Sequence, residues 1–251
     1  MIFKSKLQTT LLGVSQVLSL VIFTFFCTPV YASEGLPIYY STMQTVKTRQ
    51  DAFKSEMKKL DLEPVVFGKF KEFMAQVNSE KSKIVIAPSF FGKYDSGYCP
   101  VLRFSNAGNK NFKYLILALS DEWKNKDLSS GRIGVVEEVP REKLNDFLLD
   151  ITGKKFQMVR GVTKPEDLFP LLIFKSADFI MVSSDNLKIL KEKFTTPLKL
   201  LQETEFVDAP GVFVRKDAST KDLVAKLSQL TPVTSAALGF TSLEPCEGCT
   251  Q

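Results

Sequence analysis

The feature that most constrains this chain is a double alternation of short apolar runs with segments of helical periodicity. At its midpoint, within residues 127–136, a polar turn carrying Gly131 leads into the β-branched run Arg132–Val136. Apolar runs of this length are typical of buried parallel strands. We therefore predict two α/β units of similar size, the second beginning at Asp127.

In the first unit, three strand-like runs are separated by two stripes of helical spacing. The strands are expected at 36–40, 62–67 and 83–87, and the helices over 46–60 and 70–77. An alternation of strands and helices in this order requires a parallel sheet covered by helices.

Two further strand-like runs interrupt this rhythm before the second unit begins. They lie at 101–105 and 112–118, and the turn-rich linker 106–110 leaves no room for a helix between them. The two runs are expected to form either a hairpin or a pair of crossing strands.

The second unit repeats the first. Its strands are expected at 132–136, 155–159 and 179–182, and its helices over 140–151, 163–174 and 187–194. Thr163 and Glu166 have the spacing of a capping box, and Ser184 is predicted to cap the last of these helices. Strands at 198–203 and 211–214, a helix after Ser219 and a polar tail complete the chain.

The N-terminus reads as a signal peptide covering residues 1–32. Lys4 and Lys6 precede an apolar run, and Val30-Tyr31-Ala32 places small residues where a signal peptidase cuts. We expect cleavage after Ala32 and export to the periplasm. The alternative is an uncleaved membrane anchor over residues 11–32, which is just long enough to span a bilayer of about 30 Å.

The net charge and the cysteine content limit the partners, the disulfides and the metal sites that the chain can have. The net charge is +5 over 251 residues, without a long run of like charges, so nucleic acid is not an expected partner. Beyond the predicted signal peptide only Cys99, Cys246 and Cys249 remain, which allows one disulfide, within the C-terminal pair or to Cys99. Cys246 and Cys249 are also secondary candidates for a soft metal such as copper(I). No cofactor is expected.

An enzymatic function finds no support in the sequence. The chain has no histidine, so it has no Ser-His-Asp or Cys-His arrangement, and it has no Gly-rich dinucleotide motif or Walker loop. We therefore predict that the protein is not an enzyme.

Three motifs, taken in order, resemble the type 2 periplasmic substrate-binding proteins, and most of all the phosphonate and phosphate-ester family of ABC importer binding proteins. The first is the strand 112–118 followed by Asp-Leu-Ser-Ser-Gly-Arg-Ile-Gly-Val-Val at 127–136, similar to the "DLKGKRIGV" entry into the second lobe. The second is Ser-Ala-Asp-Phe-Ile-Met-Val at 176–182, and the third is Val-Phe-Val-Arg-Lys-Asp at 212–217. The resemblance covers nearly all of the chain after the signal peptide.

The resemblance implies a two-lobe α/β fold, each lobe a mainly parallel sheet flanked by helices, with the lobes joined by crossing strands. Lobe one would comprise 33–118 and 205–251, and lobe two 119–204. It also implies a monomeric, exported protein that closes around a small anionic or zwitterionic ligand and presents it to a membrane importer. The alternative is a relative with the same fold that serves sensing, assembly or metal handling through its C-terminal CxxC.

Five residues beside expected strand ends or helix starts are candidate ligand contacts. Hydroxyl groups at a helix start, beside free backbone N–H groups, suit an anion, and they are candidates at Ser41, Thr42, Ser89 and Ser183. The same residue types also serve as ordinary helix caps, so both interpretations remain open. Tyr114 is a candidate because its ring could line a cleft, although a packing role is equally consistent with its position.

The chain departs from the family pattern directly after the strand 132–136. Glu137 and Glu138 stand where phosphonate binders usually carry small hydroxyl residues and glycine. Two carboxylates would repel a doubly charged phosphonate. Glu137 is therefore a candidate partner for the amine of a zwitterion, or both carboxylates face solvent at a helix start. A receptor also needs an open, polar cleft, whereas filling by Phe90, Phe91 and Tyr94 would argue against one.

Overall fold

The structure is a computed structural model that describes residues 35–39, 47–80, 82–105, 111–229 and 240–246. Residues 35–251 form one compact unit. The predicted signal peptide and its cleavage site lie outside the described residues. Within the described part of the chain, no helix is both long enough and apolar enough to span a membrane.

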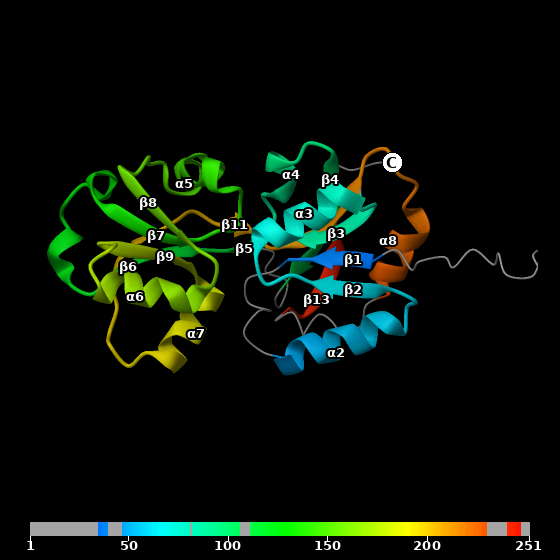
Figure 1. Cartoon of the computed structure of the whole chain (residues 1–251), viewed down its shortest axis with the longest axis horizontal. Coiled ribbons are helices and arrows are strands. Elements are labelled where there is room, and N and C mark those ends of the chain that lie inside the picture. The colour runs from blue at the N-terminus through cyan, green and yellow to red at the C-terminus, as the bar shows by residue number, and fades with distance from the viewer. Residues whose placement is uncertain (1–34, 40–46, 81, 106–110, 230–239, 247–251) are drawn as a thin grey trace, which may run out of the picture. The chain divides into compact units, whose positions relative to one another are not determined.

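The first of two large sheets has six strands in the order β13-β4-β12-β3-β1-β2 (Figure 1). They are β1 (Gly35–Ile38), β2 (Glu63–Val66), β3 (Ile84–Ala87), β4 (Tyr98–Ser105), β12 (Gly211–Arg215) and β13 (Ser242–Pro245). Strand β1 runs parallel to β2 and β3, whereas β12 runs antiparallel to β3 and β4. The parallel part of this sheet confirms the three strands predicted for the first unit.

Helices cover both faces of the first sheet because its strands are apolar on both sides. The helices are α2 (Lys47–Lys58), α3 (Phe70–Glu80), α4 (Phe91–Tyr94) and α8 (Lys221–Ser228). Phe53 and Met57 of α2 pack with Leu227 of α8 in one core, and Phe73 of α3 packs with Phe91 of α4 in another. The predicted helical stripe over 70–77 is therefore the buried face of α3.

The second sheet has five strands in the order β10-β6-β9-β7-β8. They are β6 (Tyr114–Ala118), β7 (Arg132–Val136), β8 (Met158–Val162), β9 (Phe179–Ser183) and β10 (Lys199–Glu203). Strand β7 is parallel to β8 and β9, and β6 is antiparallel to β9 and β10. Helix α5 (Leu144–Thr152) covers one face, and α6 (Leu168–Ile173) and α7 (Ser184–Lys193) cover the other.

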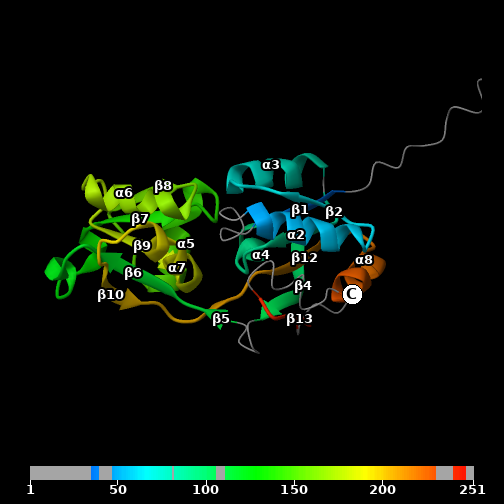
Figure 2. The ribbon, with the colours of Figure 1, turned by 90° about the horizontal axis from the view of Figure 1, so that it is seen from below.

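Two short strands form the crossing between the sheets. Strand β5 (Asn111–Phe112) pairs antiparallel with β11 (Val207–Asp208) as a separate ribbon, visible between the sheets in Figure 2. The runs 101–105 and 112–118 are therefore not a hairpin, and the prediction of crossing strands is confirmed. Each large sheet is flanked by helices, which confirms the predicted two-lobe α/β fold class.

One strand lies in a different sheet from the one predicted. Residues up to 118 were expected in lobe one, but β6 lies between β10 and β9 of the second sheet. Its residues are mostly buried, which suits a strand with neighbours on both sides rather than one at an edge. The remaining lobe boundaries stay a proposal.

Two predicted helix caps are wrong in detail. The hydroxyl of Ser183, rather than that of Ser184, caps α7 by accepting a hydrogen bond from the Asn186 backbone N–H at 3.2 Å. The capping box at Thr163 is absent from the 3-10 turn η5 (Pro165–Asp167), whose N-cap residue makes no side-chain cap bond. Glu166 instead forms an ion pair with Lys193 at 2.8 Å, which joins η5 to α7.

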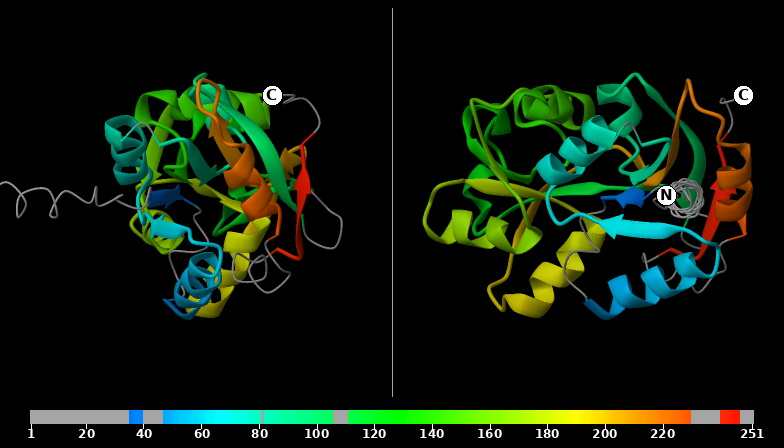
Figure 3. Two further views of the ribbon diagram at one scale, coloured as in Figure 1. Left: turned by 90° about the vertical axis from the view of Figure 1, so that its right-hand side faces the viewer. Right: turned by 45° about the vertical axis from the view of Figure 1, so that its right-hand side comes forward.

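The C-terminal tail contributes a strand that the sequence analysis did not predict. Strand β13 pairs antiparallel with β4 at the sheet edge, drawn in red in Figure 3. Beyond it, the Cys246 backbone N–H donates to the Val101 carbonyl at 3.0 Å. Cys99, near the start of β4, is disulfide-bonded. Cys249 lies outside the described residues.

An ion pair between Arg132 and Asp178 connects the starts of β7 and β9. These residues belong to the motifs at 127–136 and 176–182, so the pair links two of the three motifs. The guanidinium donates to both carboxylate oxygens, at 3.0 and 2.7 Å, and the Arg132 backbone N–H donates to the same carboxylate at 2.9 Å. Hydrogen bonding from Arg132 is the largest cause that holds the pKa of Asp178 below its ordinary value.

The variant Asp178→Asn is expected to lose about 0.5–1 kcal/mol of stability at neutral pH, since the pair is partly exposed to solvent. Because the folded-state pKa is lowered, this contribution is present above the ordinary carboxyl pKa and disappears as the pH falls through the folded value. Urea unfolding of both proteins from pH 7 to pH 3 should therefore show a difference that shrinks in acid. A difference that stays constant over this range would contradict the assignment.

Candidate functional site

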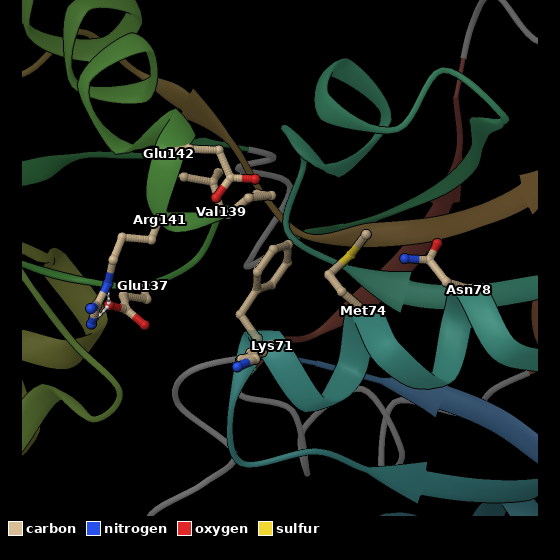
Figure 4. Close-up of a pocket in the computed structure, with 9 residues that line it drawn as sticks. Lys71, Met74, Asn78, Glu137, Val139, Arg141 and Glu142 are labelled. Atoms are coloured by element: carbon tan, nitrogen blue, oxygen red, sulfur yellow. Dashed lines mark hydrogen bonds and ion pairs between the residues drawn. The ribbon is translucent and has the colours of Figure 1, made fainter.

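A cleft of about 550 Å³ lies between α3 of the first sheet and the segment that follows β7 of the second (Figure 4). Its walls are formed by Phe70, Lys71, Met74 and Asn78 on one side and by Glu137, Val139, Pro140, Arg141 and Glu142 on the other. Helix α3 follows β2, so both walls begin beyond the carboxyl end of a parallel strand. This is the edge at which α/β sheets bind ligands.

The floor of the cleft is apolar. Phe70 and Val139 are buried, and Met74 and Pro140 are half-buried beside them. Phe70 is held by an edge-on contact with Tyr39, with 5.2 Å between the ring centroids. Because this aromatic packing fixes the first turn of α3, it also fixes where Lys71 stands at the rim of the cleft.

Glu137 is anchored at the rim of the opposite wall. Its carboxylate Oε1 accepts hydrogen bonds from Arg141 Nε at 2.8 Å and Nη2 at 2.5 Å. Its side chain is 16% exposed, whereas that of Arg141 is 75% exposed. A Cβ atom on Gly161 would stand 2.4 Å from this Oε1, so the carboxylate rests directly against the glycine backbone of β8. Glycine is therefore required at position 161 for this arrangement.

Glu138 points away from solvent. It is 6% exposed, and its Oε2 accepts a hydrogen bond from the Tyr114 hydroxyl at 2.5 Å. The expectation that both carboxylates face solvent is therefore wrong, because Glu137 is paired with Arg141 and Glu138 is buried against Tyr114. The pair Tyr114–Glu138 connects the first residue of β6 to the turn that forms the cleft wall.

Two sets of contacts connect the two sides of the cleft. One involves Tyr39, which follows β1 of the first sheet, and the other involves α4 and the residue before it. The Tyr39 hydroxyl donates to the Glu137 carbonyl at 3.0 Å. Near α4, the Phe90 ring packs on Phe147 of α5 with 4.7 Å between centroids. Beside it, Lys93 Nζ and the Tyr94 hydroxyl contact Asp150 Oδ2 at 2.5 and 3.2 Å.

The three bulky residues at α4 that could have filled the cleft lie in two different cores. Phe90 and Tyr94 pack against the core of the second sheet, whereas Phe91 is buried in the core of the first. Burial, followed by the negative charge of Asp150, raises the pKa of Tyr94, which keeps its hydroxyl protonated as a donor. Side chains from the two sheets therefore meet near α4, whereas the cleft of about 550 Å³ lies beside α3.

The variant Phe90→Ala is expected to loosen this contact, because it removes an aromatic pair worth about 0.5–1.5 kcal/mol beyond its buried area. Small-angle scattering should then show a larger radius of gyration than for the natural protein. Phe174→Ala is the matched control, since Phe174 is 78% exposed and its removal should leave the scattering unchanged. Identical scattering for all three proteins would exclude a role for Phe90 in joining the two sides.

The structure separates the residues that the sequence analysis grouped as ligand contacts. Ser41 and Thr42 lie outside the described residues, and α2 is described only from Lys47 onward. Ser89 lines a different hollow of about 400 Å³, beside the crossing strand β11, and Ser183 serves as a helix cap. Among the predicted residues that the structure describes, only Glu137 lines the cleft.

Lys71, the cation of the opposite wall, was not among the residues predicted from the sequence. Its position in the first turn of a helix that follows a parallel strand was the available signal. It was overlooked because lysines on helix faces were attributed to solvent. For metals, no group of three or more His, Cys, Asp or Glu side chains in the described residues could hold an ion.

Solved structures match most of this chain at low identity. PhnD1 from Prochlorococcus marinus, in complex with methylphosphonate, has a TM-score of 0.62 at 14% identity, over 86% of this chain and 94% of that chain. A binding protein component of an ABC phosphonate transporter from Pseudomonas aeruginosa has a TM-score of 0.59 at 10% identity, over 85% and 82%. The GluR0 ligand-binding core from Nostoc punctiforme, in complex with L-glutamate, has a TM-score of 0.53 at 13% identity, over 80% and 89%.

No protein-family model matches the sequence, and no curated protein matches it. At these identities the likeness to the solved structures is one of fold. The chain has the two-lobe α/β fold of the type 2 periplasmic binding proteins, which confirms the resemblance predicted from its motifs.

Proposed function

We propose that this protein is an exported solute-binding protein that holds a small anionic or zwitterionic solute between its two lobes and presents it to an ABC-type membrane importer. The observation that carries the proposal is the cleft of about 550 Å³, whose apolar floor is rimmed by charged side chains from both walls. Binding sites for small molecules commonly combine a concave apolar surface with a few polar groups that fix orientation.

The solved structures with this fold support the same class of function. Two of them are described as a phosphonate transporter component and as a complex with methylphosphonate, and a third as a complex with L-glutamate. Export to the periplasm, cleavage after Ala32, the absence of enzymatic activity and a monomeric state belong to this proposal. They rest on the sequence patterns and on the likeness to solved binding proteins with this fold.

Native mass spectrometry of the protein released from the periplasm tests this proposal. A bound small molecule, lost when the protein is denatured, is the expected result. A protein that carries no solute, and that acquires none from a periplasmic extract, would contradict the proposal.

A second candidate is a relative that uses the fold for sensing or assembly. The contacts of Phe90 and Tyr94 with the second sheet favour it, because they join the two sides of the cleft through the protein's own side chains. In that case the variant Phe90→Ala would change the binding of an assembly or signalling partner and leave the amount of retained solute unchanged.

A further inference from the structure

The two walls of the cleft carry opposite charges with unused hydrogen-bonding capacity. Both bonds from Arg141 end on Oε1 of Glu137, so Oε2 has no partner among the described residues. Figure 4 shows this second oxygen pointing away from Arg141. On the other wall, the Lys71 ammonium forms no ion pair within the described part of the chain. The cleft therefore offers an acceptor on one wall and a cation on the other.

Glu137 is held in place by three contacts, two with backbone of β8 and one with the Tyr39 side chain. Its N–H donates to the Val162 carbonyl at 2.8 Å, and its carbonyl accepts from the Tyr39 hydroxyl at 3.0 Å. Its carboxylate lies against Gly161, where a Cβ would collide with it. A carboxylate fixed in this way is preorganised, so a solute cation would bind it with little cost in side-chain ordering.

The same turn is poorly equipped to bind an anion. The backbone N–H groups of Glu137 and Glu138 are used by the carbonyls of Val162 and Val136, at 2.8 and 3.0 Å. Pro140, the N-cap residue of the turn η4 (Arg141–Lys143), has no N–H. A phosphonate dianion would therefore meet the carboxylate of Glu137 where a helix N-terminus would otherwise offer free donors.

We propose that Glu137 determines specificity by accepting the ammonium group of an amino-acid-type zwitterion on Oε2, while Lys71 binds its carboxylate. The apolar part of the solute lies over Phe70 and Met74. This inference rests on the proposed solute-binding function and narrows it, since phosphonates and other dianions are rejected.

Thermal-shift measurements with each of the twenty standard amino acids, and with methylphosphonate, identify the probe for the natural protein. Titration calorimetry then measures that amino acid against the variants. Glu137→Gln should weaken its binding at least about tenfold, a loss of about 1.4 kcal/mol. Glu192→Gln is the control. It removes one exposed carboxylate from α7, a helix that covers the second sheet but does not line the cleft, so it should leave affinity unchanged.

Two further variants keep the test valid if Glu137→Gln folds poorly. Gly161→Ala retains every charge but displaces the carboxylate of Glu137, so it should weaken binding of the same amino acid by a similar factor. Lys71→Gln alters an exposed side chain and should also weaken it about tenfold. Unchanged affinity in Gly161→Ala and Lys71→Gln, with folding verified by circular dichroism, would overturn the inference.

The ligand panel separates failure of this inference from failure of the proposed function. Binding of methylphosphonate but of no amino acid would overturn the role of Glu137 and leave a solute-binding protein. The same holds if no probe binds but native mass spectrometry finds another retained solute. If no solute is found by either method, both proposals fail.

Discussion

Replacing Phe73 with alanine is expected to lower the free energy of unfolding by about 3–5 kcal/mol, the usual range for a fully buried phenylalanine. Phe73 is 0% exposed and lies at the centre of an aromatic cluster on the helix that forms one wall of the cleft. Its ring centroid is 5.6 Å from that of Phe91 and 5.8 Å from that of Tyr39. The loss includes the buried area and the cavity that remains.

Urea unfolding followed by circular dichroism measures this loss. Phe174→Ala is the matched control, because Phe174 is 78% exposed and its removal should change stability by no more than about 0.5 kcal/mol. Equal effects of the two substitutions would show that the packing around α3 is not the source of stability described above.

The variant Tyr114→Phe is expected to cost about 1–3 kcal/mol, because it removes the hydroxyl that donates to the buried carboxylate of Glu138. It should also weaken solute binding, since this bond connects β6 to the turn that carries Glu137. Tyr98→Phe is the matched control, since it removes a buried hydroxyl that donates to the Ser82 carbonyl, and neither of these residues lines the cleft. The control should cost about 0.5–1.5 kcal/mol, as expected for a bond to an uncharged group.

Chemical denaturation and calorimetry of both tyrosine variants separate the two effects. The expected result is that both variants lose stability and only Tyr114→Phe loses affinity. If Tyr98→Phe lowers affinity equally, the loss reflects general destabilisation, and the link from Tyr114 to the cleft wall is wrong.

The sequence predicted the parts of the fold that depend on local pattern. Strand β7 is an apolar run bounded by a polar turn, and α3 is a continuous helical stripe, so each was recognised from its own residues. Strands β11 and β13 have two and four residues and are defined by distant partners, β5 and β4. No local periodicity can show such pairings, and for the same reason β6 was assigned to the wrong sheet.

The candidate site was less predictable than the fold, because the pairing register of β7 and β8 brings its residues together. Glu137 rests on Gly161 only because β7 and β8 are parallel with Val135 opposite Gly161. The serine candidates were ambiguous for another reason, since the residue types that suit an anion also suit a helix cap, and Ser183 is the cap of α7. Glu137 could be singled out from the sequence because it breaks the pattern of the family that the sequence resembles, and it lines the cleft.

The most direct test of solute binding in the cleft is thermal unfolding of the natural protein across increasing concentrations of small anionic and zwitterionic solutes. A solute that binds only the folded state adds stability of RT ln(1 + [L]/Kd), or about 2.7 kcal/mol at a hundredfold excess over Kd. The account predicts a midpoint that rises steadily with the logarithm of concentration for at least one amino-acid-type zwitterion, and a smaller rise in Glu137→Gln. A midpoint that does not move for any solute would contradict it.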